Sequence, residues 1–230
     1  FSSHEIGLLF GNVQSGKTGQ MFGIMCKSAD LGFPAFVLLT TDNVVLQQQT
    51  LDRVKSDLEG FCICGENDSR LFTDNSLIQP AIIVLKKNVR VLKLWSNILN
   101  STGFMKGNPL FIIDDEADAA SLNTLVNRDR QSSINKYLDI IKNGSSSSLY
   151  LQVTGTPQAI FLQTIASGWH PYFTYYFQPG DAYLGGDFFF PVSGKPDCIS
   201  FLDTIKKPTH AVVLRHLAVS AQILSSGGKV

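Results

Sequence analysis

The glycine-rich stretch FGNVQSGKTGQM, residues 10–21, has the residue types and spacing to hold a chain of phosphates. Its glycines, lysine and threonine fit the pattern G-x-x-x-x-G-K-[ST]. Glycine lets several backbone N–H groups converge on an anion, because a side chain there would block the approach. In such loops the lysine reaches the β- and γ-phosphates, and the hydroxyl binds Mg²⁺. The spacing therefore predicts that ATP and Mg²⁺ bind at Gly11, Gln14, Ser15, Gly16, Lys17 and Thr18.

An acidic cluster in LFIIDDEADAAS, residues 110–121, has the groups needed for hydrolysis. A carboxylate at a strand end can hold Mg²⁺, and a neighbouring glutamate can orient and deprotonate the attacking water. Asp115 and Glu116 fit these two roles, although the acidic pair could also begin at Asp114. Solvated acids that cap the next helix are the alternative. The predicted catalytic residues are Lys17, Asp115 and Glu116, and the predicted magnesium ligands are Thr18 and Asp115.

A third stretch, VTGTPQA at residues 153–159, offers two hydroxyls beside the acids. Thr154 and Thr156 flank Gly155, and Pro157 stiffens the turn. Alone, this stretch would be read as a structural turn. Because it follows the other two motifs in order, we expect its threonines to couple the nucleotide site to the rest of the protein, with Asp118 as a further coupling residue.

Apolar runs alternate with helical patterns along the chain. The predicted strands are residues 6–10, 35–39, 81–85, 110–113 and 149–153, and the predicted helices are 18–29, 44–58, 89–99, 134–141 and 158–166. Residues 61–80 read as irregular, and residues 143–148 as a flexible loop. This alternation predicts an α/β fold with a parallel sheet and helices on both faces. Ligands of such sheets bind at the carboxyl ends of the strands, where all three motifs fall.

Composition limits the remaining possibilities. The 230 residues include 19 Lys+Arg and 19 Asp+Glu, and this balance gives no global basic footprint for nucleic acid, although a local basic face is still allowed. The four cysteines lack a zinc spacing, so we expect free thiols in a reducing, cytoplasmic compartment. No apolar run reaches the ~20 residues that a membrane span requires, so we expect no membrane partner.

The texture of the chain changes after Trp169, where aromatic residues crowd between glycines and prolines. We expect residues 1–168 to form the ATP-binding lobe. Residues 169–230 would form an aromatic, glycine-rich connector and a helix at 211–224 that leads towards a second lobe. The aromatics at 172–177 could stack bases, but a core or interlobe contact is the favoured interpretation. Because the chain begins with Phe1, it reads as part of a longer protein.

The order GKT, DEAD, TGTP resembles the first RecA-like lobe of superfamily-two helicases and translocases. In detail the sequence is similar to the Z-one domain family of endonucleases, which belong to bacterial restriction and phage-defence operons. The similar stretches run from Gly11 to about Phe190, and Gln14, Ser15 and Asn123 are their more specific residues. These stretches are GNVQSGKT, TTDNVVLQQQTLDRV, VLKKNVRVL, IIDDEADAASLNT, VTGTPQAIF and YLGGDFFF.

The resemblance implies a RecA-like P-loop NTPase that acts on DNA in restriction or anti-phage defence. It also implies a second RecA-like lobe outside this chain, which supplies an arginine finger, and defence-system protein partners. Neither Arg90 nor Arg215 is assigned as that finger. The residues placed at the nucleic-acid face or in coupling are Thr41, Asp42, Asn43, Gln47, Lys86, Lys87, Thr154 and Thr156. A solvated helix face at Gln47 and an ordinary charged loop at Lys86 and Lys87 are equally good interpretations.

Two alternatives to a DNA-dependent ATPase stay open. The chain could be a nucleotide-sensing switch that binds ATP and a protein partner with little hydrolysis. It could also be a P-loop ATPase without a nucleic-acid role. An endonuclease activity finds no support in the residues themselves, because no compact carboxylate–lysine constellation lies away from the predicted ATP site.

Overall fold

The computed structural model describes residues 3–75, 77–101, 106–119, 132–162, 168–185, 188 and 193–194. The chain divides into two compact units, residues 1–183 and 184–230, and all helices and strands described below belong to the first. Asn123, Arg215, the predicted helix at 211–224 and the last four residues of the predicted helix at 158–166 lie outside the described residues.

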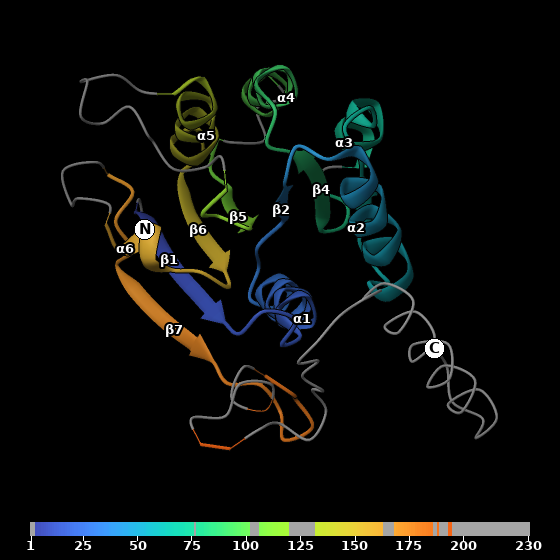
Figure 1. The fold of residues 1–230 in the computed structure, drawn as a ribbon. Coiled ribbons are helices and arrows are strands. Elements are labelled where there is room, and N and C mark those ends of the chain that lie inside the picture. The colour runs from blue at the N-terminus through green and yellow to red at the C-terminus, as the bar shows by residue number, and fades with distance from the viewer. Residues whose placement is uncertain are drawn as a thin grey trace, which may run out of the picture. The chain divides into compact units, whose positions relative to one another are not determined.

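Seven strands form a single parallel sheet in the first unit (Figure 1). Their order across the sheet is β3-β4-β2-β5-β6-β1-β7, and every pair of neighbours is parallel. The strands are β1 (His4–Gly11), β2 (Ala35–Thr40), β3 (Cys62–Cys64), β4 (Ala81–Lys86), β5 (Pro109–Asp115), β6 (Ser147–Thr154) and β7 (Phe173–Phe177). The five strands predicted from apolar runs correspond to β1, β2, β4, β5 and β6.

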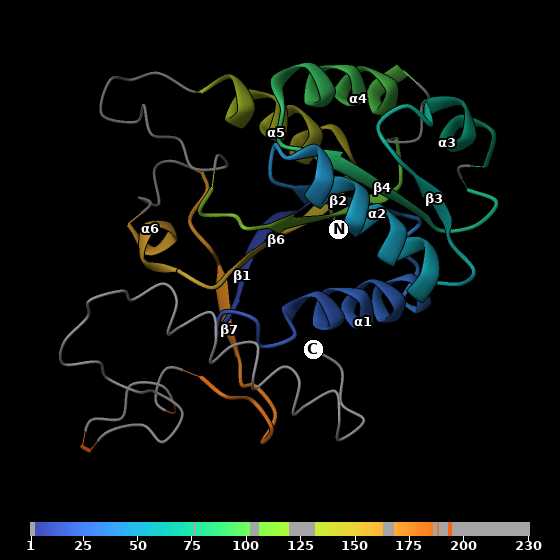
Figure 2. The ribbon, with the colours of Figure 1, turned by 45° about the vertical axis from the view of Figure 1, so that its right-hand side comes forward.

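Helices cover both faces of this sheet, which confirms the predicted α/β class. Figure 2 shows α1 below the sheet and α4 and α5 above it. The helices are α1 (Lys17–Asp30), α2 (Val44–Asp57), α3 (Ser69–Asn75), α4 (Val89–Ser101), α5 (Ser133–Gly144) and α6 (Gln158–Phe161). Within the described part of the chain, none of them has the length and apolar character of a membrane span.

The core explains why the central strands read as unbroken apolar runs. Every residue of β2 is buried. Its alternate side chains serve two clusters: Phe36 and Leu38 pack with residues of α1 and α2, whereas Val37 and Leu39 pack with residues of α3, α4 and α5. Because successive side chains of a strand point to opposite faces, a strand covered on both sides needs apolar residues at each position. Trp95 of α4 is the largest of the fully buried side chains.

The region from residue 61 to residue 80 is more ordered than we predicted. It contains the short strand β3 and the helix α3, with Phe72 as the one buried residue of that helix. Three strand residues and one buried helix residue are too few to produce a periodic pattern, so neither element could be predicted from this stretch. Cys62 and Cys64 lie on this strand as free thiols, as their spacing predicted.

The prediction of a flexible loop at residues 143–148 was also wrong. Helix α5 continues to Gly144, and β6 begins at Ser147. The serines that suggested a flexible linker are partly strand residues, and the Ser148 hydroxyl lies 2.9 Å from the Nδ1 atom of His4. Only residues 145 and 146 separate the two elements.

The stretch after residue 169 is not only a connector. Trp169 belongs to the core, where its ring meets that of Tyr150 edge-on. Residues 173–177 form β7, which pairs with β1 at the edge of the sheet. The side chains of Tyr172, Phe173, Tyr175 and Tyr176 are exposed, so the expected core contact is wrong for them. The domain boundary at residue 168 stays a prediction.

Candidate nucleotide-binding and hydrolysis site

The three motifs follow three neighbouring strands. Strand β6 lies between β1 and β5, with Phe10 opposite Thr154 and Asp115 opposite Val153. Because these strands are parallel and in this register, their carboxyl ends lie level. The glycine loop, the acids and the TGTP turn therefore meet at one edge of the sheet, which we call the ATP edge.

The loop from β1 to α1 has the backbone of a tight anion-binding turn. Gln14 and Gly16 have φ angles of 58° and 93°, in the left-handed region, and the Ser15 N–H donates to the Asn12 carbonyl at 3.2 Å. Gly16 precedes α1 without a side-chain cap, and the first turn of that helix contains no acid. The first N–H groups and the positive dipole end of α1 are consequently available to a phosphate.

Lys17 lies folded over its own loop. Its ammonium donates to the carbonyl oxygens of Gly11 at 3.2 Å and Asn12 at 2.9 Å. An ammonium has three N–H donors, so two are used within the loop and one is left for an incoming oxygen. A phosphate that recruits Lys17 fully has to displace at least one of these carbonyl contacts.

Close packing requires glycine at two positions around this loop. A Cβ atom at Gly155 would lie 3.2 Å from Val13 Cγ2 and 3.4 Å from Lys17 Nζ. A Cβ atom at Gly11 would lie 2.9 Å from the Phe177 carbonyl oxygen. The TGTP turn and strand β7 thus both pack closely against the loop. Gly155 is the residue at which the third motif approaches the first.

The Ser15 hydroxyl is buried and, within the described residues, finds no hydrogen-bond partner. Such orphaned polar atoms are rare in folded proteins and call for a physical explanation. Its position inside a loop with the backbone of an anion site fits a group that acquires its partner when phosphate binds and the loop rearranges.

Two tyrosines that were not predicted as site residues also contact the loop. The Tyr183 hydroxyl donates to the Val13 carbonyl at 2.7 Å, and the Tyr176 hydroxyl lies 3.4 Å from Asn12 Oδ1. The Tyr176 ring also packs against Phe10, with ring centroids 5.1 Å apart. Tyr183 opens the stretch YLGGDFFF and Tyr176 lies in the aromatic run at 172–177, but neither stretch indicates a contact with a loop about 170 residues away along the chain.

The structure distinguishes between the two readings of the acidic pair. Asp114 is fully buried, with one carboxylate oxygen 3.0 Å from the Lys87 ammonium and the other accepting from the Tyr150 hydroxyl at 2.7 Å. Asp115 ends strand β5 and is half-buried, whereas Glu116 is exposed. The pair at the open edge therefore begins at Asp115, and Asp114 is an interior anchor.

Lys87 is not where its sequence context placed it. Its side chain is 1% exposed, and its ammonium donates to Asp114 Oδ1 at 3.0 Å, to the Asp115 carbonyl at 2.8 Å and to the Glu116 carbonyl at 2.7 Å. All three N–H donors are used. The predicted contact between Lys87 and nucleic acid is therefore wrong for this structure, because the side chain points inwards to the acids.

The two acids at the edge have unusual environments. Burial raises the pKa of Asp115 to about 6, and the neighbouring Glu116 adds to the rise, while the Lys87 ammonium acts against it. Glu116 has a φ angle of 54°, a left-handed conformation that few residues other than glycine adopt. Backbone strain of this kind concentrates at functional sites, where surrounding contacts maintain it.

Asp118 links the acids to the TGTP turn. The Thr154 hydroxyl donates to one of its carboxylate oxygens at 2.6 Å, and the Thr156 hydroxyl donates to the other. Burial raises the pKa of Asp118, but these two hydrogen bonds lower it, and the net pKa lies below its ordinary value. The Ala117 N–H also donates to the Val153 carbonyl at 3.0 Å, so the two segments are joined by backbone as well.

Two of the residues predicted for nucleic acid at the end of β2 already have hydrogen-bond partners within the protein. The Asn43 side chain caps α2 by accepting from the Val45 and Leu46 N–H groups, at 2.9 and 3.1 Å. Asp42 is exposed and accepts from the Asn88 amide at 3.0 Å. The Thr41 hydroxyl is buried and, among the described residues, lacks a partner. We call the ends of β2 and β4 the outer edge.

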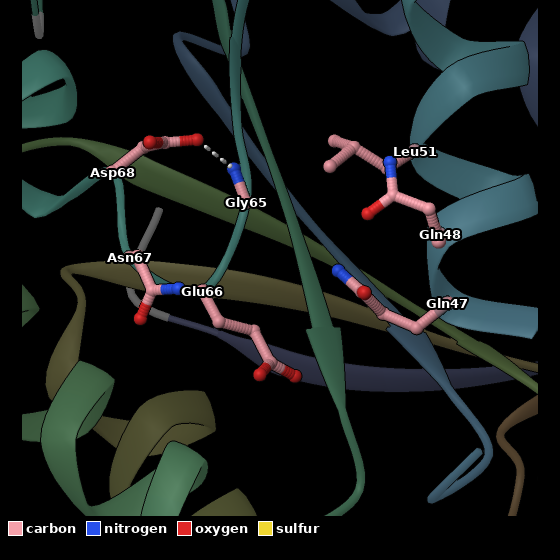
Figure 3. Close-up of a pocket in the computed structure, with 7 residues that line it drawn as sticks. All are labelled: Gln47, Gln48, Leu51, Gly65, Glu66, Asn67 and Asp68. Atoms are coloured by element: carbon pink, nitrogen blue, oxygen red, sulfur yellow. Dashed lines mark hydrogen bonds between the residues drawn. The ribbon is translucent and has the colours of Figure 1, made fainter. Parts of the chain in front are cut away.

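Gln47 lines a pocket beside the outer edge (Figure 3), and Lys86 lines a second pocket that shares Glu66 and Asn67 with the first. Gln47 is 7% exposed, and its amide nitrogen lies 3.5 Å from the Val84 carbonyl. Glu66, a residue that sequence reasoning missed, accepts from the Lys86 N–H at 3.0 Å and lies 3.7 Å from the Lys86 ammonium. The charge of Lys86 is thereby largely balanced, and Gln47 is a poor phosphate contact because its side chain is buried against β4.

The predicted magnesium ligands are suited to that ion. Thr18 and Asp115 offer hard oxygen atoms at the ATP edge, and Mg²⁺ is commonly held by one or two carboxylates together with substrate phosphates and water. Within the described part of the chain, no cluster of three or more His, Cys, Asp or Glu side chains is placed to hold a metal. A bound magnesium would therefore depend on the nucleotide for several of its ligands.

No protein-family model and no curated protein matches the sequence. Among solved structures, the chain is similar to the Pyrococcus furiosus Hef helicase domain, with a TM-score of 0.50 and 15% identity over 76% of this chain. The match spans 35% of that helicase structure, so this chain corresponds to about a third of it.

A second similar structure is B204, the DNA-packaging ATPase from Sulfolobus Turreted Icosahedral Virus. It has a TM-score of 0.40 and 14% identity, with 67% of each chain covered, a similarity too low to carry an argument. Together with the parallel sheet and its strand order, the first match confirms a RecA-like α/β P-loop fold for this chain.

Proposed function

We propose that this chain is the ATP-binding and hydrolysing lobe of a helicase- or translocase-like protein that acts on DNA. The observation that carries the proposal is the ATP edge itself. A glycine loop with a helix N-terminus, an exposed glutamate beside a half-buried aspartate, and a threonine pair tied to Asp118 meet at the ends of three adjacent strands.

The roles of the residues follow from their positions. The loop amides and Lys17 would bind the phosphates, with Thr18 and Asp115 holding Mg²⁺. The ion would screen the phosphate charge that develops during transfer. Glu116 is the exposed acid at this edge, so it would orient the attacking water and accept its proton. Thr154 and Thr156 would sense the state of the acids through Asp118.

DNA as the partner is supported by the sequence resemblance to superfamily-two helicases and by the fold shared with a helicase domain. Thr41, Asp42, Asn43 and Lys86 remain the candidate contacts at the outer edge. Gln47 and Lys87 are withdrawn from that set, because their side chains are buried and engaged. A second RecA-like lobe, outside this chain, would supply the arginine that completes the motor.

A role in restriction or anti-phage defence rests on the resemblance to the Z-one domain family, as does an associated endonuclease activity. Incubation of the full-length protein with plasmid DNA and Mg²⁺ tests the nuclease directly. Cutting that is lost in Lys17→Ala, together with ATP binding, would tie it to the motor. Plasmid that stays intact would remove the endonuclease from the proposal.

ATP hydrolysis by the full-length protein, with and without DNA, tests the main proposal. We expect turnover that DNA stimulates and that Lys17→Ala abolishes, because the loop then loses its phosphate-binding cation. Asp42→Ala is a suitable partner variant: it should reduce stimulation by DNA without abolishing ATP binding. ATP turnover that DNA does not stimulate would instead indicate a P-loop ATPase without a nucleic-acid role.

One observation favours a second candidate, the nucleotide-sensing switch. Lys17 is held by two carbonyl oxygens of its own loop, so an ATP phosphate that recruits Lys17 fully has to release at least one of these contacts. A protein partner could read that rearrangement with little hydrolysis. Tight ATP binding without turnover in the full-length protein would favour this switch over the motor.

A further inference from the structure

Lys87 lies at the junction between β4 and α4, and its side chain contacts a different part of the protein from the side chains of its neighbours Lys86 and Asn88. Its backbone N–H donates to the Thr40 carbonyl at 2.9 Å, continuing the pairing of β4 with β2. Its side chain runs inwards to the acidic segment that follows β5. Lys86 and Asn88, on either side, instead contact groups of the outer edge: Glu66 and Asp42.

The three acceptors of the Lys87 ammonium span the turn that carries the acids. One is the Asp114 carboxylate, which Tyr150 holds from the other side, and the others are the backbone carbonyls of Asp115 and Glu116. Glu116 is the residue of this turn that has a left-handed φ angle. Such a conformation persists only where surrounding contacts over-determine it, and Lys87 supplies a contact to its carbonyl and one to the carbonyl before it.

We propose that Lys87 is a positioning residue: it fixes the backbone of the acidic turn so that Glu116 faces the nucleotide, and it transmits movements of the β4–α4 junction to that turn. The inference rests on the proposed ATPase function. It adds a path along which a partner bound at the outer edge would influence the position of the catalytic acids. Lys87 touches neither nucleotide nor DNA in this account, and it acts through the turn.

The competing explanation is a buried ion pair that merely stabilises the fold. Removing one partner of such a pair leaves an uncompensated charge, so a single variant would confuse the two explanations. The double variant Lys87→Met with Asp114→Asn removes both charges and still offers Tyr150 an acceptor. Lys142→Met is a matched control, because Lys142 is also buried and also binds a carboxylate and a carbonyl, those of Asp139 and Gly168.

The first readout separates kcat from KM in full-length protein. For the double variant we expect kcat for ATP to fall about 10- to 100-fold, as for a misplaced catalytic group, with KM for ATP within about twofold. Stimulation by DNA should fall as well, while DNA affinity stays near that of the wild type. Lys142→Met should keep the wild-type kcat. A double variant with wild-type kcat and wild-type stimulation by DNA would overturn the proposal.

The second readout does not depend on turnover. The Ala117 N–H donates to the Val153 carbonyl at 3.0 Å and the Ala119 N–H to the Glu116 carbonyl at 2.9 Å, so hydrogen exchange at these two amides reports the shape of the turn. We expect both amides to exchange faster in the double variant, and unchanged exchange in β2, which carries neither substitution.

If the wild type hydrolyses no ATP, the proposed function fails, and this exchange result alone decides whether Lys87 positions the turn. Unchanged protection of Ala117 and Ala119 would overturn the positioning role in either case.

Discussion

The ATP edge and the outer edge use their polar side chains in different ways. At the ends of β1, β5 and β6, side chains reach between segments: Thr154 and Thr156 bind Asp118, and Lys17 lies against Gly155. At the ends of β2 and β4, most polar side chains bind their own or adjacent loops, as Asn43 does in capping α2. The first edge is a connected network that joins its motifs, and the second is a set of separate caps and pairs, such as Asp42 with Asn88 and Lys86 with Glu66.

The comparison shows that polarity alone does not tell which side chains are linked across the sheet. Lys86 and Lys87 are neighbours with the same charge, yet only Lys87 reaches the acids. A substitution in the network of the ATP edge should therefore lower the free energy of unfolding more than a substitution among the separate contacts of the outer edge.

The largest effect on stability is expected for Lys87→Met. The change leaves the Asp114 carboxylate buried without its cation, which typically destabilises a protein by about 3–5 kcal/mol. Urea denaturation of the wild type and the variant measures the difference. A loss below about 1 kcal/mol would contradict the view that the two edges are joined at a buried charge pair.

Asp115→Asn should stabilise the protein at neutral pH. The folded pKa of Asp115 is raised from 3.8 to about 6, so the neutral form is favoured on folding. Its contribution to stability is full below pH 3.8 and is lost as the pH rises through about 6. A shift of that size corresponds to at most about 3 kcal/mol at pH 8.

Thermal or urea unfolding between pH 4 and pH 8, in EDTA and without nucleotide, measures this effect. The variant should exceed the wild type above pH 6 and approach it near pH 4. If the variant and the wild type have the same free energy of unfolding at pH 4 and at pH 8, the surroundings of Asp115 do not disfavour its ionised form.

Thr154→Val should have an intermediate effect. It removes a buried donor to the ionised Asp118, and a hydrogen bond to a charged group contributes about 1.5–3 kcal/mol. Thr156→Val, at an exposed position, is its control and should cost less. A double-mutant cycle with Asp118→Asn measures the coupling. If the losses of stability in the two single variants simply add in the double variant, Thr154 and Asp118 are not coupled.

Lys86→Met should have the smallest effect on stability. Its ion pair with Glu66 is 3.7 Å long and lies near the surface, where such pairs contribute about 0–1 kcal/mol. Urea denaturation checks this, with Lys87→Met as the comparison. A loss as large as that of Lys87→Met would erase the distinction between the two edges.

Much of the ATP edge could be predicted from the sequence, because its chemistry needs special backbone. Gly11 and Gly16 are glycines for reasons of close approach and left-handed φ, and the same requirements define the motif. The central strands β2 and β4 were predictable as well, because they are buried on both faces and therefore continuously apolar.

The outer edge was harder to predict, since polarity does not reveal where a side chain points. Lys87 and Gln47 look like phosphate contacts in the sequence, but one pairs with Asp114 and the other packs against β4. Glu66 and Tyr150 carry no motif, and their roles arise only when distant strands come together. Strand β3 and strand β7 were missed because each is short and lies at an edge of the sheet.

Glu116→Gln tests whether Glu116 activates the attacking water at the ATP edge. The measurement is single-turnover ATP hydrolysis by full-length protein in Mg²⁺ and DNA, beside equilibrium ATP binding. The account predicts that binding is retained and that the hydrolysis rate falls about 10²–10⁴-fold, because the amide cannot accept the proton of the attacking water. Hydrolysis at the wild-type rate would contradict the assignment of this edge as the catalytic site.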